Sequence, residues 1–200
     1  MSGGRRPEKT RATNDGTSWW KRIAWVAGVG VILGGAVFIA ADVTAPVAPP
    51  PPELEETQAF AEMNPVHLAP GAPLPEYNSN PPTSGPHDPQ PAPCGIYRQP
   101  VPDQAYLHSL EHGAVVIQYD PSVPQGVVEA LEDAVRANRG EILLAPRPDN
   151  PAPFTLAAWT RLLVVDEIDA NLVDSFEREF GNRFAPEPGA VCPFQVDQGT

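Results

Sequence analysis

The chain has 200 residues, with 13 Lys or Arg against 25 Asp or Glu and a formal net charge of −12. This length fits one domain with appendages. Residues 42–200 carry seven Arg, no Lys and 23 Asp or Glu. Nucleic-acid binding is therefore excluded for this part of the chain, because contacts with phosphates need clustered Lys and Arg.

Residues 23–41 form an uncharged run of 19 residues, which is long enough to cross a bilayer as a helix. Residues 1–22 carry a net charge of +4, whereas the residues after the run are acidic. The positive-inside rule predicts a single-pass protein of the cell membrane, with residues 1–22 as a cytoplasmic tail and the C-terminal domain outside. The alternative is a secreted product of signal cleavage near Val43-Thr-Ala45, although this apolar run is longer than signal peptides usually have.

Residues 42–73 are predicted to be a proline-rich linker. Its first part, Ala45-Pro-Val-Ala-Pro-Pro-Pro-Pro52, favours an extended polyproline II backbone. A short acidic helix is predicted over residues 53–63. Residues 74–102 are also rich in Pro and Gly, but they contain His, Tyr and Cys residues that a spacer does not need. We therefore expect them to form an ordered, extended loop against a globular domain of residues 74–200.

Apolar periodicity predicts five regular elements after this loop. They are a strand over 114–119, a helix over 124–138, a strand over 141–146, a strand over 154–165 with a break near Thr160, and a helix over 169–180. The order β-α-β-β-α is that of a split βαβ unit. It predicts an α+β fold, with a small mixed or antiparallel sheet and two helices on one of its faces.

The chain has two cysteines, Cys94 before the predicted sheet and Cys192 after it. Paired cysteines oxidise outside the reducing compartments of the cell, so a Cys94–Cys192 disulfide is predicted. It would close a loop of about 100 residues and stabilise the fold by up to about 4.7 kcal/mol in the chain-entropy model. The alternative is a metal ligand or a reactive thiol, but the sequence has no C-x-x-C motif.

Several long motifs between residues 75 and 190 resemble one bacterial family. They are Asn80-Pro-Pro-Thr-Ser-Gly-Pro-His87, Pro93-Cys-Gly-Ile-Tyr97, His108-Ser-Leu-Glu-His-Gly-Ala-Val-Val-Ile-Gln-Tyr119, Ala158-Trp-Thr-Arg-Leu162 and Pro186-Glu-Pro188. The family is catalogued as the domain of unknown function 3105 family. The resemblance implies an N-terminal membrane anchor or export signal, and it supplies no established activity.

Three of the four histidines, His87, His108 and His112, lie within these motifs, and His67 lies outside them. Together with Glu111, the three form a candidate metal-ligand set. Imidazole and carboxylate groups are the ligands that copper and zinc take in proteins. The alternative is a purely structural role, in which these side chains join the long loop to the sheet through hydrogen bonds.

The geometry of the set depends on the secondary structure around it. If residues 103–112 form a helix, capped by Asp103 and ended by Gly113, the side chains of His108, Glu111 and His112 share one face, about 6 Å apart. If residues 106–119 form one long strand, the two histidines stand about 13 Å apart. In that case these two histidines can share an ion only if a bulge forms near Gly113. Without it, His87 is expected to share an ion with one or both of them.

The H-x-x-E-H pattern of residues 108–112 also occurs in inverted zinc peptidases, where Glu111 would be the general base. That chemistry needs a long helix and an acidic ligand on a second helix, whereas Gly113 and a strand follow this motif at once.

The sequence thus favours a non-enzymatic, membrane-anchored binding module outside the cytoplasm, in which His87, His108, Glu111 and His112 form a candidate site for copper or zinc. The alternative is an accessory or interaction subunit of a membrane complex without a metal site. Such a subunit would bind the membrane through its N-terminal helix and a protein partner there. A metal-dependent hydrolase is the third hypothesis.

Overall fold

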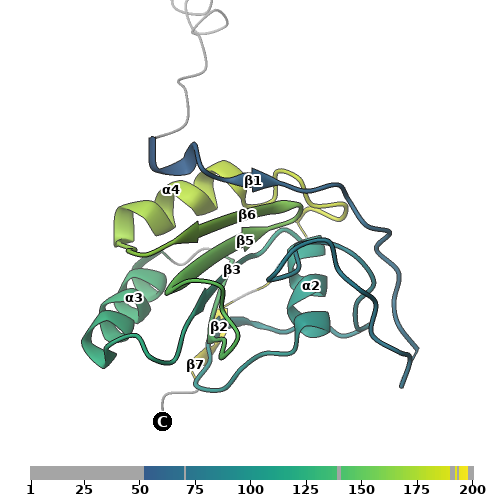
Figure 1. The fold of residues 1–200 in the computed structure, drawn as a ribbon, viewed down its shortest axis with the longest axis horizontal. Helices are drawn as coiled ribbons and strands as arrows, with labels where there is room; N and C mark the ends of the chain where they lie inside the picture. Colours follow the sequence, from purple (N-terminus) through teal and green to yellow (C-terminus); the bar gives the residue numbers. More distant parts are fainter. Residues whose placement is uncertain (1–51, 70, 139–140, 190–191, 193, 198–200) are drawn as a thin grey trace, which may run out of the picture. The chain divides into compact units, whose positions relative to one another are not determined.

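The computed structural model describes residues 52–69, 71–138, 141–189, 192 and 194–197. These residues form a mixed α+β domain, which confirms the predicted fold class (Figure 1). Its elements are η1 (Pro52–Leu54), β1 (Gln58–Ala59), β2 (Cys94–Ile96), α2 (Asp103–Glu111), β3 (Val115–Tyr119), α3 (Gln125–Asn138), β4 (Ile142–Pro146), β5 (Phe154–Ala158), β6 (Arg161–Val165), α4 (Ala170–Phe180) and β7 (Phe194–Asp197).

The predicted tail, the predicted membrane span over 23–41 and most of the proline-rich run lie outside the described residues. Of the helices that the structure describes, none has both the length and the apolar character needed to cross a bilayer.

The strands form one sheet in the order β1-β6-β5-β3-β4-β2-β7. The pairs β1–β6, β6–β5 and β5–β3 are antiparallel, and the pairs β3–β4, β4–β2 and β2–β7 are parallel. The sheet is therefore mixed, as predicted. Strands β3 and β4 are direct neighbours joined through α3, so the predicted split of the βαβ unit is wrong.

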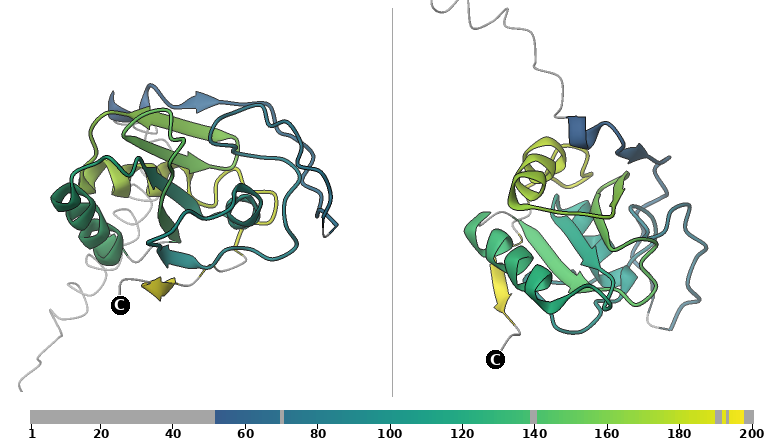
Figure 2. Two further views of the ribbon diagram at one scale, coloured as in Figure 1. Left: turned by 60° about the horizontal axis from the view of Figure 1, so that its bottom comes forward. Right: turned by 60° about the vertical axis from the view of Figure 1, so that its left-hand side comes forward.

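The central strand β3 is buried along its whole length, because helices cover both faces of the sheet. Val115, Ile117 and Tyr119 pack with α3 and α4, whereas Val116 packs with α2. Figures 1 and 2 show α3 and α4 on one side of the sheet and α2 on the other. The predicted pair of helices on one face is thus present, and α2, which the sequence left open as one of two geometries, covers the opposite face.

The short helix predicted over 53–63 is wrong, because only the turn η1 forms there and residues 58–60 lie along the sheet edge. Leu54 is buried in the core between the sheet and α4, and Gln58–Ala59 pairs with β6. The ladder continues with a hydrogen bond from Phe60 N to Thr160 O. An apolar anchor and a free sheet edge therefore hold this segment extended, in spite of its helix-favouring composition.

The predicted long strand over 154–165 is a hairpin of β5 and β6. Thr160 lies at its turn with a φ of 61°, in the left-handed region, which ends β5 and reverses the chain. Trp159 beside it is 2% exposed and packs in the core under α2.

The Cys94–Cys192 disulfide is present, which confirms that prediction. Cys94 begins β2, and Cys192 lies just before β7, the parallel neighbour of β2. Both cysteines are buried against Ala114, the residue before β3. The bond therefore fixes the long loop and the C-terminal segment at the same place on the sheet.

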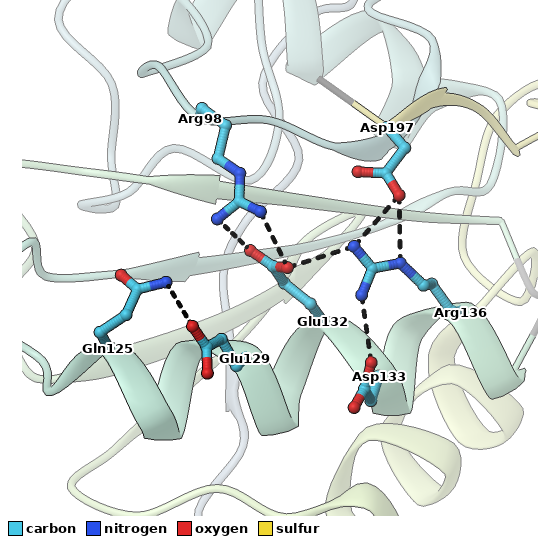
Figure 3. Close-up of polar contacts among 7 residues, drawn as sticks. All are labelled: Arg98, Gln125, Glu129, Glu132, Asp133, Arg136 and Asp197. Carbon is cyan, nitrogen blue, oxygen red and sulfur yellow. Dashed lines mark hydrogen bonds and ion pairs between the residues drawn. The ribbon is translucent and has the colours of Figure 1, made fainter. Parts of the chain in front are cut away.

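A buried carboxylate holds α3 to the strands of this sheet edge (Figure 3). Glu132 is 3% exposed, and it forms ion pairs with Arg98 after β2 and with Arg136 one turn later on α3. Arg136 also pairs with Asp197 at the end of β7. Burying a carboxylate is costly unless it is paired and hydrogen-bonded, and here two guanidinium groups form ion pairs with it and donate hydrogen bonds to its Oε2.

Gly113, just after α2, provides a direct test of this fold. Its φ is +103°, and a Cβ there would collide with the side-chain amide of Asn182. We expect Gly113→Ala to lower the free energy of unfolding by about 1–3 kcal/mol, through backbone strain and displacement of the Asn182 segment. The measurement is urea unfolding of the full chain, followed by circular dichroism.

The matched control is Gly126→Ala on α3, where a Cβ meets nothing within 4 Å. That change should leave the protein as stable or stabilise it by up to about 1 kcal/mol, since alanine favours helix. Equal effects of the two substitutions would contradict the packing described for Gly113.

Candidate metal centre

Helix α2 carries the central part of the candidate site. Tyr106, Leu107 and Leu110 pack against the sheet, and His108 and Glu111 lie one turn apart on the helix. The helix ends at Glu111, with His112 as its C-cap. Of the two geometries that the sequence left open, the structure thus has the helix.

The predicted N-cap of this helix is wrong. Pro102 takes the cap position and makes no side-chain cap bond. Asp103 is the first helical residue, and its carboxylate forms a two-pronged ion pair with Arg147. A guanidinium that offers two parallel donors binds the carboxylate in place of the helix amides.

A pair of extended segments brings two further histidines to α2. His67 and His87 form a parallel β-bridge, with hydrogen bonds from Leu68 N to His87 O (2.7 Å) and from His87 N to Val66 O (3.0 Å). The next residue, Asp88, donates its backbone N–H to Gln104 O of the helix at 3.1 Å. His67 was not among the predicted site residues, and this bridge places it beside His87.

Hydrogen bonds to the backbone orient both buried imidazoles. Nδ1 of His87 donates to Gly85 O at 2.9 Å, and Nδ1 of His108 donates to Asp88 O at 2.7 Å. A carbonyl only accepts, so in each ring Nδ1 carries a proton and Nε2 of the neutral ring presents a lone pair. Histidines that bind metals are commonly held in this way by backbone carbonyls.

The Nε2 of His87 has no hydrogen-bond partner among the described residues. It lies 3.1 Å from Oε2 of Glu111, but the contact does not have hydrogen-bond geometry. His87 is completely buried and Glu111 is 5% exposed. An imidazole nitrogen and a carboxylate therefore face each other without a hydrogen bond in the protein interior, where unpaired polar atoms are costly.

Burial lowers the pKa of His108, since it disfavours the charged imidazolium. The hydrogen bond to the Asp88 carbonyl acts in the opposite direction, and the nearby imidazoles of His87, His112 and His67 lower the pKa further. The lower pKa favours the neutral ring, which is the form that binds a metal.

Four side chains form the inner group of this centre: His67, His87, His108 and Glu111. One ligand atom from each lies within 4.8 Å of all the others. A tetrahedral ion with bonds of about 2.0–2.2 Å holds its ligand atoms about 3.3–3.6 Å apart, so the widest pairs of the group must approach by about 1 Å to share it. Three of the four side chains are buried and His67 is exposed, which leaves the group accessible from the His67 side.

An outer group adjoins the first and shares Glu111 with it. Its other members are His112 and Glu187, again with one ligand atom from each within 4.8 Å. Nε2 of His112 lies 3.1 Å from Nε2 of His108 and 3.6 Å from Oε2 of Glu187. The predicted residues His87, His108 and Glu111 thus meet in the inner group, whereas His112 lies in the outer one.

Sequence reasoning missed His67 and Glu187 as members of these groups. Glu187 lies in Pro186-Glu-Pro188, a motif already noted for the family resemblance, and this was a usable signal. His67 lies outside the motifs, and only the pairing of its segment with that of His87 brings it into the centre.

The donors present fit a transition-metal ion. Three imidazoles and one carboxylate suit Zn(II) and Cu(II), and the donors alone do not distinguish the two. The arrangement does not match an inverted zinc peptidase, in which the glutamate of the H-x-x-E-H pattern is a base, because Glu111 here belongs to both groups of candidate ligands.

A family model matches residues 72–193, which is more than half of the chain. Comparisons with curated proteins and with solved structures find no match. The matched range contains the disulfide, α2 and all the candidate ligands except His67. The predicted family is confirmed: the chain belongs to the family described as "Protein of unknown function (DUF3105)".

Proposed function

We propose that this protein binds a divalent transition-metal ion, zinc or copper(II), through His67, His87, His108 and Glu111. One observation carries the proposal: Nε2 of buried His87 faces the buried Glu111 carboxylate without a hydrogen bond. Only a positive charge between or beside these groups makes the arrangement favourable.

The charge is either a proton or a metal ion. A proton on Nε2 would make His87 an imidazolium paired with Glu111, which is the purely structural alternative. Three features favour the metal. Two imidazoles are oriented through Nδ1, a third imidazole completes the group from the surface, and burial favours neutral His108. A structural ion pair needs none of these.

The protein is further proposed to act outside the cytoplasm, on the cell membrane. The uncharged run over 23–41 and the basic residues before it support a membrane anchor with a cytoplasmic N-terminus. The Cys94–Cys192 disulfide supports an oxidising compartment for the domain. A metal site open to the surface, held near the membrane, suits a module that captures or delivers ions.

Replacing His67 tests the metal proposal without disturbing the core, because this side chain is exposed. The full chain in detergent is stripped with a chelator, reloaded with Zn(II) or Cu(II), and analysed for metal content and Tm. Wild type should retain metal, and ion at about 100 times the Kd should add about 2.7 kcal/mol of stability. We expect His67→Ala to weaken binding at least roughly tenfold, since even residues that only orient ligands typically contribute that much.

Asn64→Ala, an exposed change in the same segment, is the matched control and should bind as wild type does. No uptake of zinc or copper by wild type would refute the proposal and leave the structural alternative. Equal affinities of wild type and His67→Ala would remove His67 from the ligand set.

The membrane placement has a separate test in intact cells that carry one tag at each terminus. Protease added outside should digest the C-terminal tag and leave the N-terminal tag protected. Protection of the C-terminal tag would contradict the proposed orientation. Release of a product without the N-terminal tag would show signal cleavage instead of a retained anchor.

A further inference from the structure

We propose that the centre holds two divalent ions, with Glu111 bridging them. This inference rests on the proposed function, because the first ion is the one in the inner group. The second ion belongs to Glu111, His112 and Glu187.

The geometry separates the ligands into two sets. Among the described residues, six side chains have ligand atoms close enough to share an ion. Four of them form the inner group and three the outer group, with Glu111 in both, and within each group one ligand atom per residue lies within 4.8 Å of the others. One ion at the inner group leaves His112 and Glu187 unused. A carboxylate has two oxygens and can bind one ion with each, and ions in two-metal sites lie about 3.5–4 Å apart.

Backbone hydrogen bonds hold the outer ligands in place. Glu187 N donates to Glu111 O at 3.1 Å, so the residue that supplies the outer carboxylate is attached to the one that supplies the bridge. Asn182 N donates to Gly113 O at 2.9 Å and secures the same segment at its other end. Glu187 is thus positioned by the main chain, although its side chain is 66% exposed.

The charges at this place favour a cation. Glu111 and Glu187 have histidines, His87 and His112, as their ion-pair partners in the described part of the chain. The outer group also lies at the C-terminal end of α2, where the helix dipole is negative. An ion there adds positive charge where two carboxylates and a helix end supply negative charge.

Filling the two positions rearranges one hydrogen bond. Because Nδ1 of His108 is the donor to Asp88 O, Nε2 of His108 accepts from Nε2–H of His112 in the metal-free state. The inner ion takes the His108 lone pair and removes that acceptor. His112 would then change tautomer through solvent, gaining a proton on Nδ1 and losing the one on Nε2, so that the neutral ring offers Nε2 to the outer ion with no net proton release.

Metal stoichiometry tests the inference. The full chain in detergent is loaded with Cu(II), freed of excess ion, and examined by elemental analysis and electron paramagnetic resonance. Wild type should hold two ions per chain and show a magnetically coupled spectrum. Glu187→Gln keeps the size of an exposed side chain and removes its charge. It should hold one ion and show an isolated Cu(II) spectrum.

Glu129→Gln is the matched control, because Glu129 is an exposed glutamate that pairs with Gln125 (Figure 3), and its helix α3 lies on the face of the sheet opposite to α2 (Figure 1). It should behave as wild type. One ion in wild type would overturn the two-ion inference and leave the inner site standing, whereas none would refute the inner site itself. Two ions in Glu187→Gln, or two uncoupled ions in wild type, would overturn the assignment of the outer group.

Discussion

Two hydrogen bonds from imidazole Nδ1 atoms to backbone carbonyls are the constraint on which the centre depends. They join His87 to Gly85 and His108 to Asp88, and they fix where both Nε2 lone pairs point. The rings therefore cannot turn to hydrogen-bond Glu111 through Nδ1. The interior places Nε2 of His87 beside a buried carboxylate, a shortage of positive charge that a proton or a metal ion must make up. Both proposals follow from that shortage of positive charge.

The fold maintains this arrangement by joining segments that are distant in sequence. Helix α2 is packed on the sheet through Tyr106, Leu107 and Leu110, which sets the positions of His108 and Glu111. A backbone hydrogen bond joins the loop that carries His87 to the first turn of α2. Another backbone hydrogen bond joins the Glu187 segment to the last residue of α2. The Cys94–Cys192 disulfide fixes the loop and the C-terminal segment at one place on the sheet, so the same bond supports both sides of the centre.

Local patterns predicted the elements whose residues make regular apolar contacts. Strands β3 and β4 and helices α3 and α4 followed from apolar runs and periodicity, and the H-x-x-E-H motif gave His108, Glu111 and His112 because their spacing on a helix is local. Strands β1, β2 and β7 have two to four residues each and exist only through partners far along the chain, so no local pattern could reveal them. His67 was missed for the same reason, and Asp103 was misjudged because its partner, Arg147, is 44 residues away.

The most direct test of the central claim is the protonation of the histidine side chains in the metal-free full chain, measured by long-range proton–nitrogen NMR. The account predicts that His87 and His108 are neutral with the proton on Nδ1, and that their Nε2 resonances shift when Zn(II) is added. A His87 ring protonated at both nitrogens and unchanged by Zn(II) would contradict it. The group would then be an ion pair that joins the loop to the helix, not a metal centre.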